Sequence, residues 1–311
     1  MPGESVSRIN SAGAAQAAFV IAVKYREGVG VMTNTELKIE ALRTASKKSP
    51  EYAEIVPLFI QLYEYINGRE QETGIGIELC GAKAVEGADK GFPLLSPVAL
   101  RVQRERAVRF LMGVIAVLKE AGREGQDDLG RISEGLEHNR IDPVPLFSAV
   151  MERRRAPLDE AAAVAGVPAS LLEYIVEIPL KIALEHFAEG YSADSFPDWE
   201  EGFCPVCGSR AGMAELAGEE GRRHLSCSAC NFRWPIKRLK CPYCGNEETE
   251  KLAYFTADGG PTRVDTCSGC SRYIKTRDSR KGNADVPLEV EDLLTIHLDM
   301  LAAREGYERG K

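Results

Sequence analysis

Apolar residues recur every three or four positions through most of residues 34–188, which is the spacing of one helix face. This pattern predicts helices near residues 35–46, 50–67, 98–121, 127–138 and 143–154. Ser96-Pro97 is a suitable start for the longest of them, and Pro57 indicates a kink or a later start in the second. Strand-like alternation is nearly absent, so we expect an N-terminal all-α bundle, taken as a domain of residues 1–190.

Residues 158–188 resemble a helix-turn-helix with Gly166 at the turn. A recognition helix needs cations that face phosphate. The second helix of this pair instead carries Glu173 and Glu177 and no base before Lys181. We therefore interpret the segment as two bundle helices joined by a glycine turn.

Eight of the nine cysteines fall in four CxxC pairs, which are Cys204/Cys207, Cys227/Cys230, Cys241/Cys244 and Cys267/Cys270. Paired thiols in a long chain are typical of metal ligands rather than of a disulfide framework. The residue after each second cysteine favours a left-handed backbone, which Gly208, Asn231 and Gly245 suit better than Ser271 does. Cys80 stands alone and is interpreted as a buried small hydrophobic residue.

Pairing neighbouring CxxC motifs gives two four-cysteine sites, one over residues 204–230 and one over residues 241–270. Interleaved pairing is possible but would make the chain cross itself. Segments this short rarely fold on a hydrophobic core alone, so metal binding would supply the missing stability. We expect two small metal-stabilised β modules of the rubredoxin or zinc-ribbon type, at residues 191–240 and 241–285.

The metal is not fixed by the ligands, because a tetrahedral all-thiolate site serves zinc and a single iron equally well. The Cys-Pro-x-Cys-Gly form at Cys204 and Cys241 resembles rubredoxin, whereas the loops between pairs are closer in length to a zinc ribbon. Four protein ligands leave no open position for water or substrate. No P-loop, GxSxG or HExxH motif occurs, so we expect a protein that is not an enzyme.

Residues flanking the cysteine-rich segment complete the prediction. Trp199, Phe203, Phe232 and Trp234 are expected to cover the metal sites as hydrophobic lids. A last helix near residues 289–305 is expected to pack on the rest, as a unit of residues 286–311.

The net charge of −8 argues against a protein whose main role is wrapping nucleic acid. Residues 203–281 carry 14 Lys or Arg and 9 Asp or Glu, so the remainder carries −13. A divalent ion with four thiolates has a charge of about −2, which this local excess of bases would offset. The bases could also face nucleic acid, which is the less favoured interpretation.

The apolar run at residues 12–23 is interrupted only by Gln16. It is shorter than the roughly 20 residues that span a bilayer, and no small-residue cleavage site follows it. We therefore expect an N-terminal arm of a cytoplasmic protein.

The order of helical half, four CxxC motifs and the closing sequence at residues 290–299 resembles the formate dehydrogenase accessory protein family, FdhE. The resemblance implies a cytoplasmic maturation factor that binds the precursor catalytic subunit of a respiratory formate dehydrogenase before export. It also implies rubredoxin-like sites that hold iron, with zinc as the alternative metal. A zinc-ribbon nucleic-acid or transcription factor and a rubredoxin-like electron carrier are the alternative functions.

Overall fold

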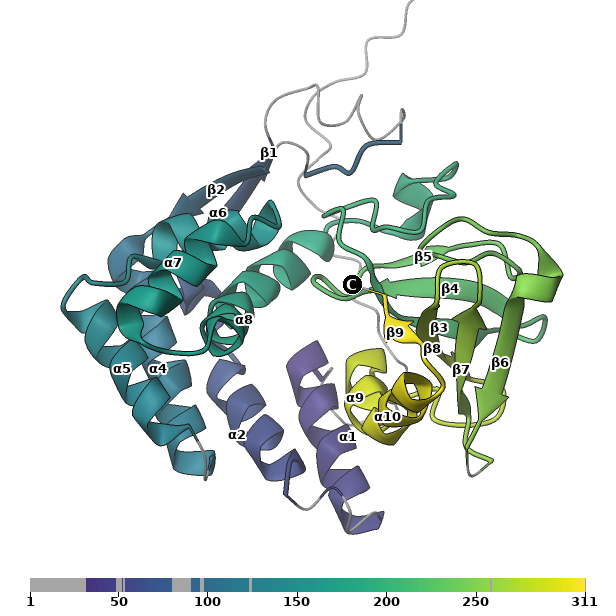
Figure 1. The fold of residues 1–311 in the computed structure, drawn as a ribbon, viewed down its shortest axis with the longest axis horizontal. Coiled ribbons are helices and arrows are strands. Elements are labelled where there is room, and N and C mark those ends of the chain that lie inside the picture. Colours follow the sequence, from purple (N-terminus) through teal and green to yellow (C-terminus); the bar gives the residue numbers. More distant parts are fainter. Residues whose placement is uncertain are drawn as a thin grey trace, which may run out of the picture.

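The computed structural model describes residues 32–48, 52, 54–79, 91–95, 98–122, 125–257 and 259–310. The predicted N-terminal arm and Cys80 lie outside these residues. Helices gather on one side of the molecule and a β-sheet on the other (Figure 1). Of the described residues, no single helix is long and apolar enough to cross a membrane, although the helices Ala156–Ala165 and Ala169–Ala188 together pass that test as a pair bent by 113°.

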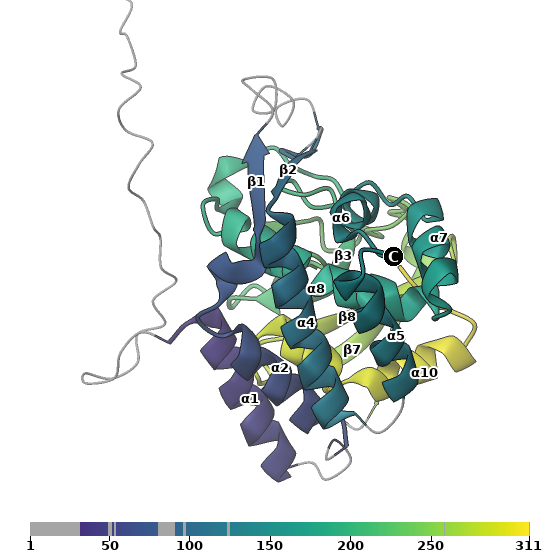
Figure 2. The ribbon, with the colours of Figure 1, turned by 90° about the vertical axis from the view of Figure 1, so that its left-hand side faces the viewer.

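The helical half contains seven described helices. They are α1 (Asn34–Lys48), α2 (Val56–Ile66), α4 (Arg104–Ala121), α5 (Gln126–Glu137), α6 (Pro143–Met151), α7 (Ala156–Ala165) and α8 (Ala169–Ala188). The later start predicted for the second helix is confirmed, with Pro57 in its first turn. Figure 2 shows α1, α2 and α4 side by side, and α8 carries ten buried side chains between this group and the sheet.

The helical half also holds a β-hairpin that the hydrophobic pattern did not predict. β1 (Ile75–Leu79) pairs antiparallel with β2 (Val98–Val102), so the expectation of an all-α half and of a helix over residues 98–102 is wrong. Ser96 and Pro97, the predicted start of that helix, lie outside the described residues. Gly74 precedes the hairpin at φ +70°, and a Cβ there would lie 2.7 Å from the backbone nitrogen of Ala107. The hairpin therefore packs on the start of α4 because this position has no side chain.

The cysteine-rich region forms one seven-stranded sheet rather than two separate ones. Its strands are β3 (Ala211–Ala217), β4 (Arg222–Cys227), β5 (Arg233–Pro235), β6 (Leu252–Thr256), β7 (Thr262–Cys267), β8 (Arg272–Asp278) and β9 (Glu308–Arg309). The strand order is β5-β4-β3-β8-β7-β6, and β9 pairs with β8. β3 and β8 run parallel, so hydrogen bonds join the strands of the first four-cysteine segment to those of the second.

The C-terminal segment forms two helices where one was predicted, α9 (Leu288–Leu293) and α10 (Ile296–Arg304). The buried ammonium of Lys275 donates to the carbonyl oxygens of Asp292 and Thr295, at 2.7 and 3.3 Å. The Thr295 hydroxyl also donates to the Glu291 carbonyl, at 2.7 Å. These contacts satisfy carbonyls that a continuous helix would use, so the helix breaks over Lys275.

The largest hydrophobic core runs without interruption from the helical half into the first four-cysteine segment, and it includes Phe110, Leu172, Trp199 and Trp234. A smaller core joins Val264 of β7 to α10. The first cysteine segment is thus built into the helical half, whereas the second has its own small core.

A buried cluster of charges fastens α1, α8 and α9 together. The Lys38 ammonium lies 3.0 Å from the Glu185 carboxylate and 2.6 Å from that of Glu289, and the Lys181 ammonium lies 2.7 Å from Glu289. Burial would raise the pKa of Glu289, but Lys181 and Lys38 hold it well below its usual range. Burial raises the pKa of Glu185, which Lys38 only partly opposes. The two lysines are therefore needed to keep Glu289 ionised in the interior.

We predict that Lys38→Met lowers the free energy of unfolding by about 3–5 kcal/mol, because Glu185 loses its paired cation and Glu289 keeps only Lys181. Urea unfolding at fixed metal content measures the change. Arg43→Met on the same helix is the matched control, since Arg43 forms an exposed ion pair with Glu64 that is worth only about 0–1 kcal/mol. Equal losses in the two variants would contradict the structural role given to the buried cluster.

Candidate metal centres

The structure brings the eight paired cysteines into two groups of four, each contributed by neighbouring CxxC motifs. The first group is Cys204, Cys207, Cys227 and Cys230, and the second is Cys241, Cys244, Cys267 and Cys270. In each group all four Sγ atoms lie within 4.8 Å of one another. The neighbouring arrangement, rather than the interleaved one, is therefore the one that the chain adopts.

The spacing of the sulfur atoms matches a tetrahedral metal site. In the first group the Cys204–Cys230 and Cys207–Cys227 Sγ pairs are 3.6 and 3.4 Å apart. In the second group the Cys241–Cys270 and Cys244–Cys267 pairs are 3.7 and 3.8 Å apart. A metal–sulfur bond of about 2.3 Å in a tetrahedron places its sulfurs about 3.8 Å apart. Both groups are thus large enough for one four-coordinate ion and have the donor set to hold it.

Each CxxC turn is followed by a residue in the left-handed region, at Gly208, Asn231, Gly245 and Ser271. Their φ angles lie between 54° and 74°, so Ser271 adopts the conformation even though its side chain suits it less well. In the second turn the backbone N–H groups of Ala229 and Cys230 point at the Cys227 sulfur, at 3.4 and 3.5 Å. Such donors offset the negative charge of a thiolate.

The two groups differ in exposure. All four cysteines of the first group are buried. In the second group Cys241 and Cys267 are buried, Cys270 is half-buried and Cys244 is exposed. An ion in the second site would therefore be open to solvent on one side, whereas an ion in the first would not.

The helical half holds the first turn of the first site in place. The backbone N–H groups of Leu94 and Leu95 donate to the carbonyls of Pro205 and Val206, at 2.7 and 2.9 Å. The Arg153 guanidinium donates to the Gly208 carbonyl, at 2.8 Å. Residues that lie far from the cysteines in sequence thus fix the shape of their turn.

The aromatic side chains that were predicted as lids belong to the same hydrophobic core as the four cysteines of the first site. Trp234 is fully buried, and its indole nitrogen donates to the Glu201 carbonyl, at 3.0 Å. Phe196 packs edge-on against both Trp199 and Phe232. The four cysteines are buried in this core, where electrostatic interactions are stronger than in water.

Asn231 is a residue whose role the sequence did not reveal. Its side-chain amide donates to the carboxylates of Glu185 and Glu289, at 2.8 and 2.9 Å. Asn231 directly follows Cys230, so the second turn of the first site is tied to the buried charge cluster. From the sequence, an asparagine directly after a CxxC pair indicated only a left-handed backbone conformation.

As thiols, the cysteines of the first group do not ionise alike. Burial raises the pKa of Cys204 and Cys230, whereas hydrogen bonds from Cys204 and its neighbours lower the pKa of Cys207. A second thiolate beside Cys207 is disfavoured, because two negative charges this close repel each other. A metal that takes four thiolates must displace the remaining protons, so its affinity falls as the pH falls.

In the described part of the chain, no histidine belongs to either group of candidate metal ligands. His224 lies on β4, and its buried Nδ1 has no hydrogen-bond partner in the described part of the chain. His138, His186 and His297 lie on exposed positions of the helical elements. The donor sets are therefore sulfur alone.

Together, the helical half, the shared sheet and two closed four-cysteine clusters define a two-part protein built around two candidate metal centres. Family models described as "FdhE, central domain" and "FdhE, C-terminal domain" match residues 203–238 and 239–311. The crystal structure of the FdhE protein from Pseudomonas aeruginosa has the same fold, with a TM-score of 0.65 at 20% identity over 88% of this chain and 93% of that one.

Curated relatives extend the match. A Protein FdhE homolog from Aquifex aeolicus is 26% identical over 277 residues, which are 88% of this chain and 92% of the relative. Another from Pseudomonas aeruginosa is 34% identical over 154 residues, which are 46% of this chain and 48% of the relative. The FdhE family models thus account for residues 203–311, and most of the remaining chain is similar to the Aquifex aeolicus relative.

We predict that the protein binds two metal ions and that a chelator removes them in two phases. The fast phase removes half of the metal and comes from the second site, because Cys244 is exposed. Metal analysis during treatment with excess chelator measures both phases. Cys244→Ser should abolish the fast phase and keep the slow one, and its matched variant Cys207→Ser should abolish the slow one. A single phase in the wild type would contradict the difference between the sites.

Proposed function

We propose that this protein is a non-enzymatic maturation factor that binds the precursor catalytic subunit of a respiratory formate dehydrogenase in the cytoplasm, before export. The observation that carries the proposal is the pair of closed four-cysteine clusters within the domains that match the FdhE models. Centres with four protein ligands have no open position for substrate, so their role is to shape a binding surface.

The connections of the first centre support this role. Its turns contact the segment around Leu94, Arg153 in the turn after α6, and the charge cluster through Asn231. A change in its ligation would alter the packing of the helical half against the sheet. Metal binding at the first centre would thus determine whether the helical half and the sheet together form the surface that binds the catalytic subunit.

We propose iron as the ion at both sites. The Cys-Pro-x-Cys-Gly sequences at Cys204 and Cys241 resemble those of rubredoxin, which holds one iron. The sulfur spacing accepts iron and zinc alike, so the proposal depends on this sequence resemblance rather than on distance. Iron would add an oxidation state that changes with redox conditions and would let the binding surface respond to them.

The test is retention of the precursor catalytic subunit by immobilised, metal-loaded protein. Wild-type protein should retain it, and Cys204→Ser/Cys207→Ser should retain at least tenfold less, because the first centre loses two ligands. Ser228→Ala is the matched control, since Ser228 is exposed between Cys227 and Cys230 and its side chain is not a ligand. Failure of the wild-type protein to retain the subunit would contradict the proposed function.

A further inference from the structure

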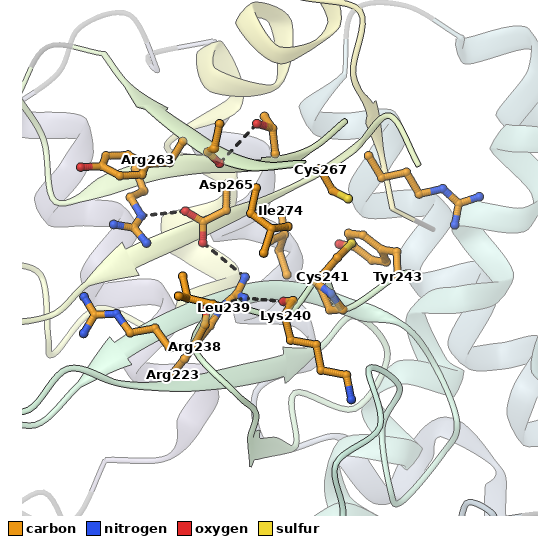
Figure 3. Close-up of a pocket in the computed structure, with 16 residues that line it drawn as sticks. Arg223, Arg238, Leu239, Lys240, Cys241, Tyr243, Arg263, Asp265, Cys267 and Ile274 are labelled. Atoms are coloured by element: carbon orange, nitrogen blue, oxygen red, sulfur yellow. Dashed lines mark hydrogen bonds and ion pairs between the residues drawn. The ribbon is translucent and has the colours of Figure 1, made fainter. Parts of the chain in front are cut away.

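A cleft opens beside the second cysteine group, between residues 238–243 and strands β6 and β7. It has a volume of about 80 Å³. Cys241 and Cys267 line it at one end, and Arg223, Asp265 and Arg263 lie along it towards the other (Figure 3). The cleft therefore lies where the sequences of the central and C-terminal family domains meet.

The cleft has a strong excess of positive charge. Five bases line it, which are Arg223, Arg238, Lys240, Arg263 and Arg272, and Asp265 is the only acid among its lining residues. Asp265 is already engaged by Arg223, at 3.3 Å, and by Arg263, at 2.7 Å. Neither Arg238 nor Arg272 forms an ion pair with a described residue. A metal centre of charge about −2 beside the cleft would offset only part of this excess.

Arg223 carries an unsatisfied donor at this cleft. Its side chain is 5% exposed, and its two terminal nitrogens reach the carbonyl of Lys240, at 2.8 Å, and the carboxylate of Asp265. Its Nε is buried and has no hydrogen-bond partner within the described residues. A buried cationic donor without a partner is costly, so negative charge in the cleft beside it would be favoured.

The rim of the cleft is apolar and exposed. Leu239 and Tyr254 line it and are 58% and 63% exposed, and they belong to a set of only seven large hydrophobic residues that are exposed in the described part of the chain. The Arg263 guanidinium stacks over the Tyr254 ring, 4.3 Å from its centroid. Tyrosine and arginine beside an apolar patch are typical of the energetic centres of protein interfaces. A free inorganic anion has no apolar surface to bury against this rim.

We propose that the cleft docks an acidic segment of a partner polypeptide. A carboxylate of the segment pairs with the guanidinium groups of Arg238 and Arg272, and an adjacent apolar side chain covers Leu239 and Tyr254. This inference rests on the proposed function and names the part of the surface that would take the catalytic subunit.

The test compares two double variants in binding the precursor catalytic subunit. Arg238→Gln/Leu239→Ser removes a charge and an apolar side chain from the rim, and we expect it to weaken binding at least tenfold and to flatten its salt dependence. The matched control Arg222→Gln/Val164→Ser removes the same chemistry from exposed positions that do not line the cleft, and it should bind as the wild type does. Metal content should be unchanged in both.

The outcomes separate the two proposals. If the wild type binds the subunit and the rim variant binds equally well, the cleft inference is wrong and the proposed function stands. If the wild type does not bind the subunit, the proposed function is wrong, and a synthetic peptide of alternating glutamate and leucine then tests the cleft alone. Binding of this peptide that the rim variant loses supports the cleft. Equal binding of the glutamine counterpart, displacement by millimolar inorganic phosphate, or tighter binding of an RNA oligonucleotide would overturn it.

Discussion

Four sulfur atoms held within 4.8 Å of one another, at two places in the chain, set the condition under which the sheet region keeps its shape. As thiolates they repel one another, and as thiols they leave the turns without the attraction that closes them. A cation bound by all four thiolates offsets their repulsion and holds the turns together. Its binding free energy then contributes to the free energy of folding. The shared sheet and the core of the helical half also hold these segments, so the ion acts mainly on the turns that carry the cysteines.

The two clusters occupy different surroundings because the largest hydrophobic core contains the cysteines of the first group but not those of the second. The first lies in the core that continues into the helical half, and Asn231 ties it to the charges on α1, α8 and α9. The second lies outside that core, with Cys244 exposed and the basic cleft beside it. The first centre is thus placed to support the architecture, and the second is placed where a partner can reach it.

Much of this could be predicted from local sequence. Helical periodicity predicted most of the helices, and the CxxC spacing predicted both cysteine groups and the left-handed residues after them. The hairpin was missed because Val98 to Val102 also fits an apolar helix face. The parallel pairing of β3 with β8 was missed because it joins residues about 60 positions apart, which no local pattern reports. The roles of Lys38 and Arg223 depend on burial, which their charged side chains alone would not indicate.

X-ray absorption spectroscopy of the purified full-length protein at the metal edge tests the central claim most directly. Ligation by the eight cysteines predicts four sulfur neighbours per ion, at about 2.3 Å, with two ions per chain. Oxygen or nitrogen neighbours in place of sulfur, or protein that is folded and metal-free with its cysteines oxidised to one another, would contradict it.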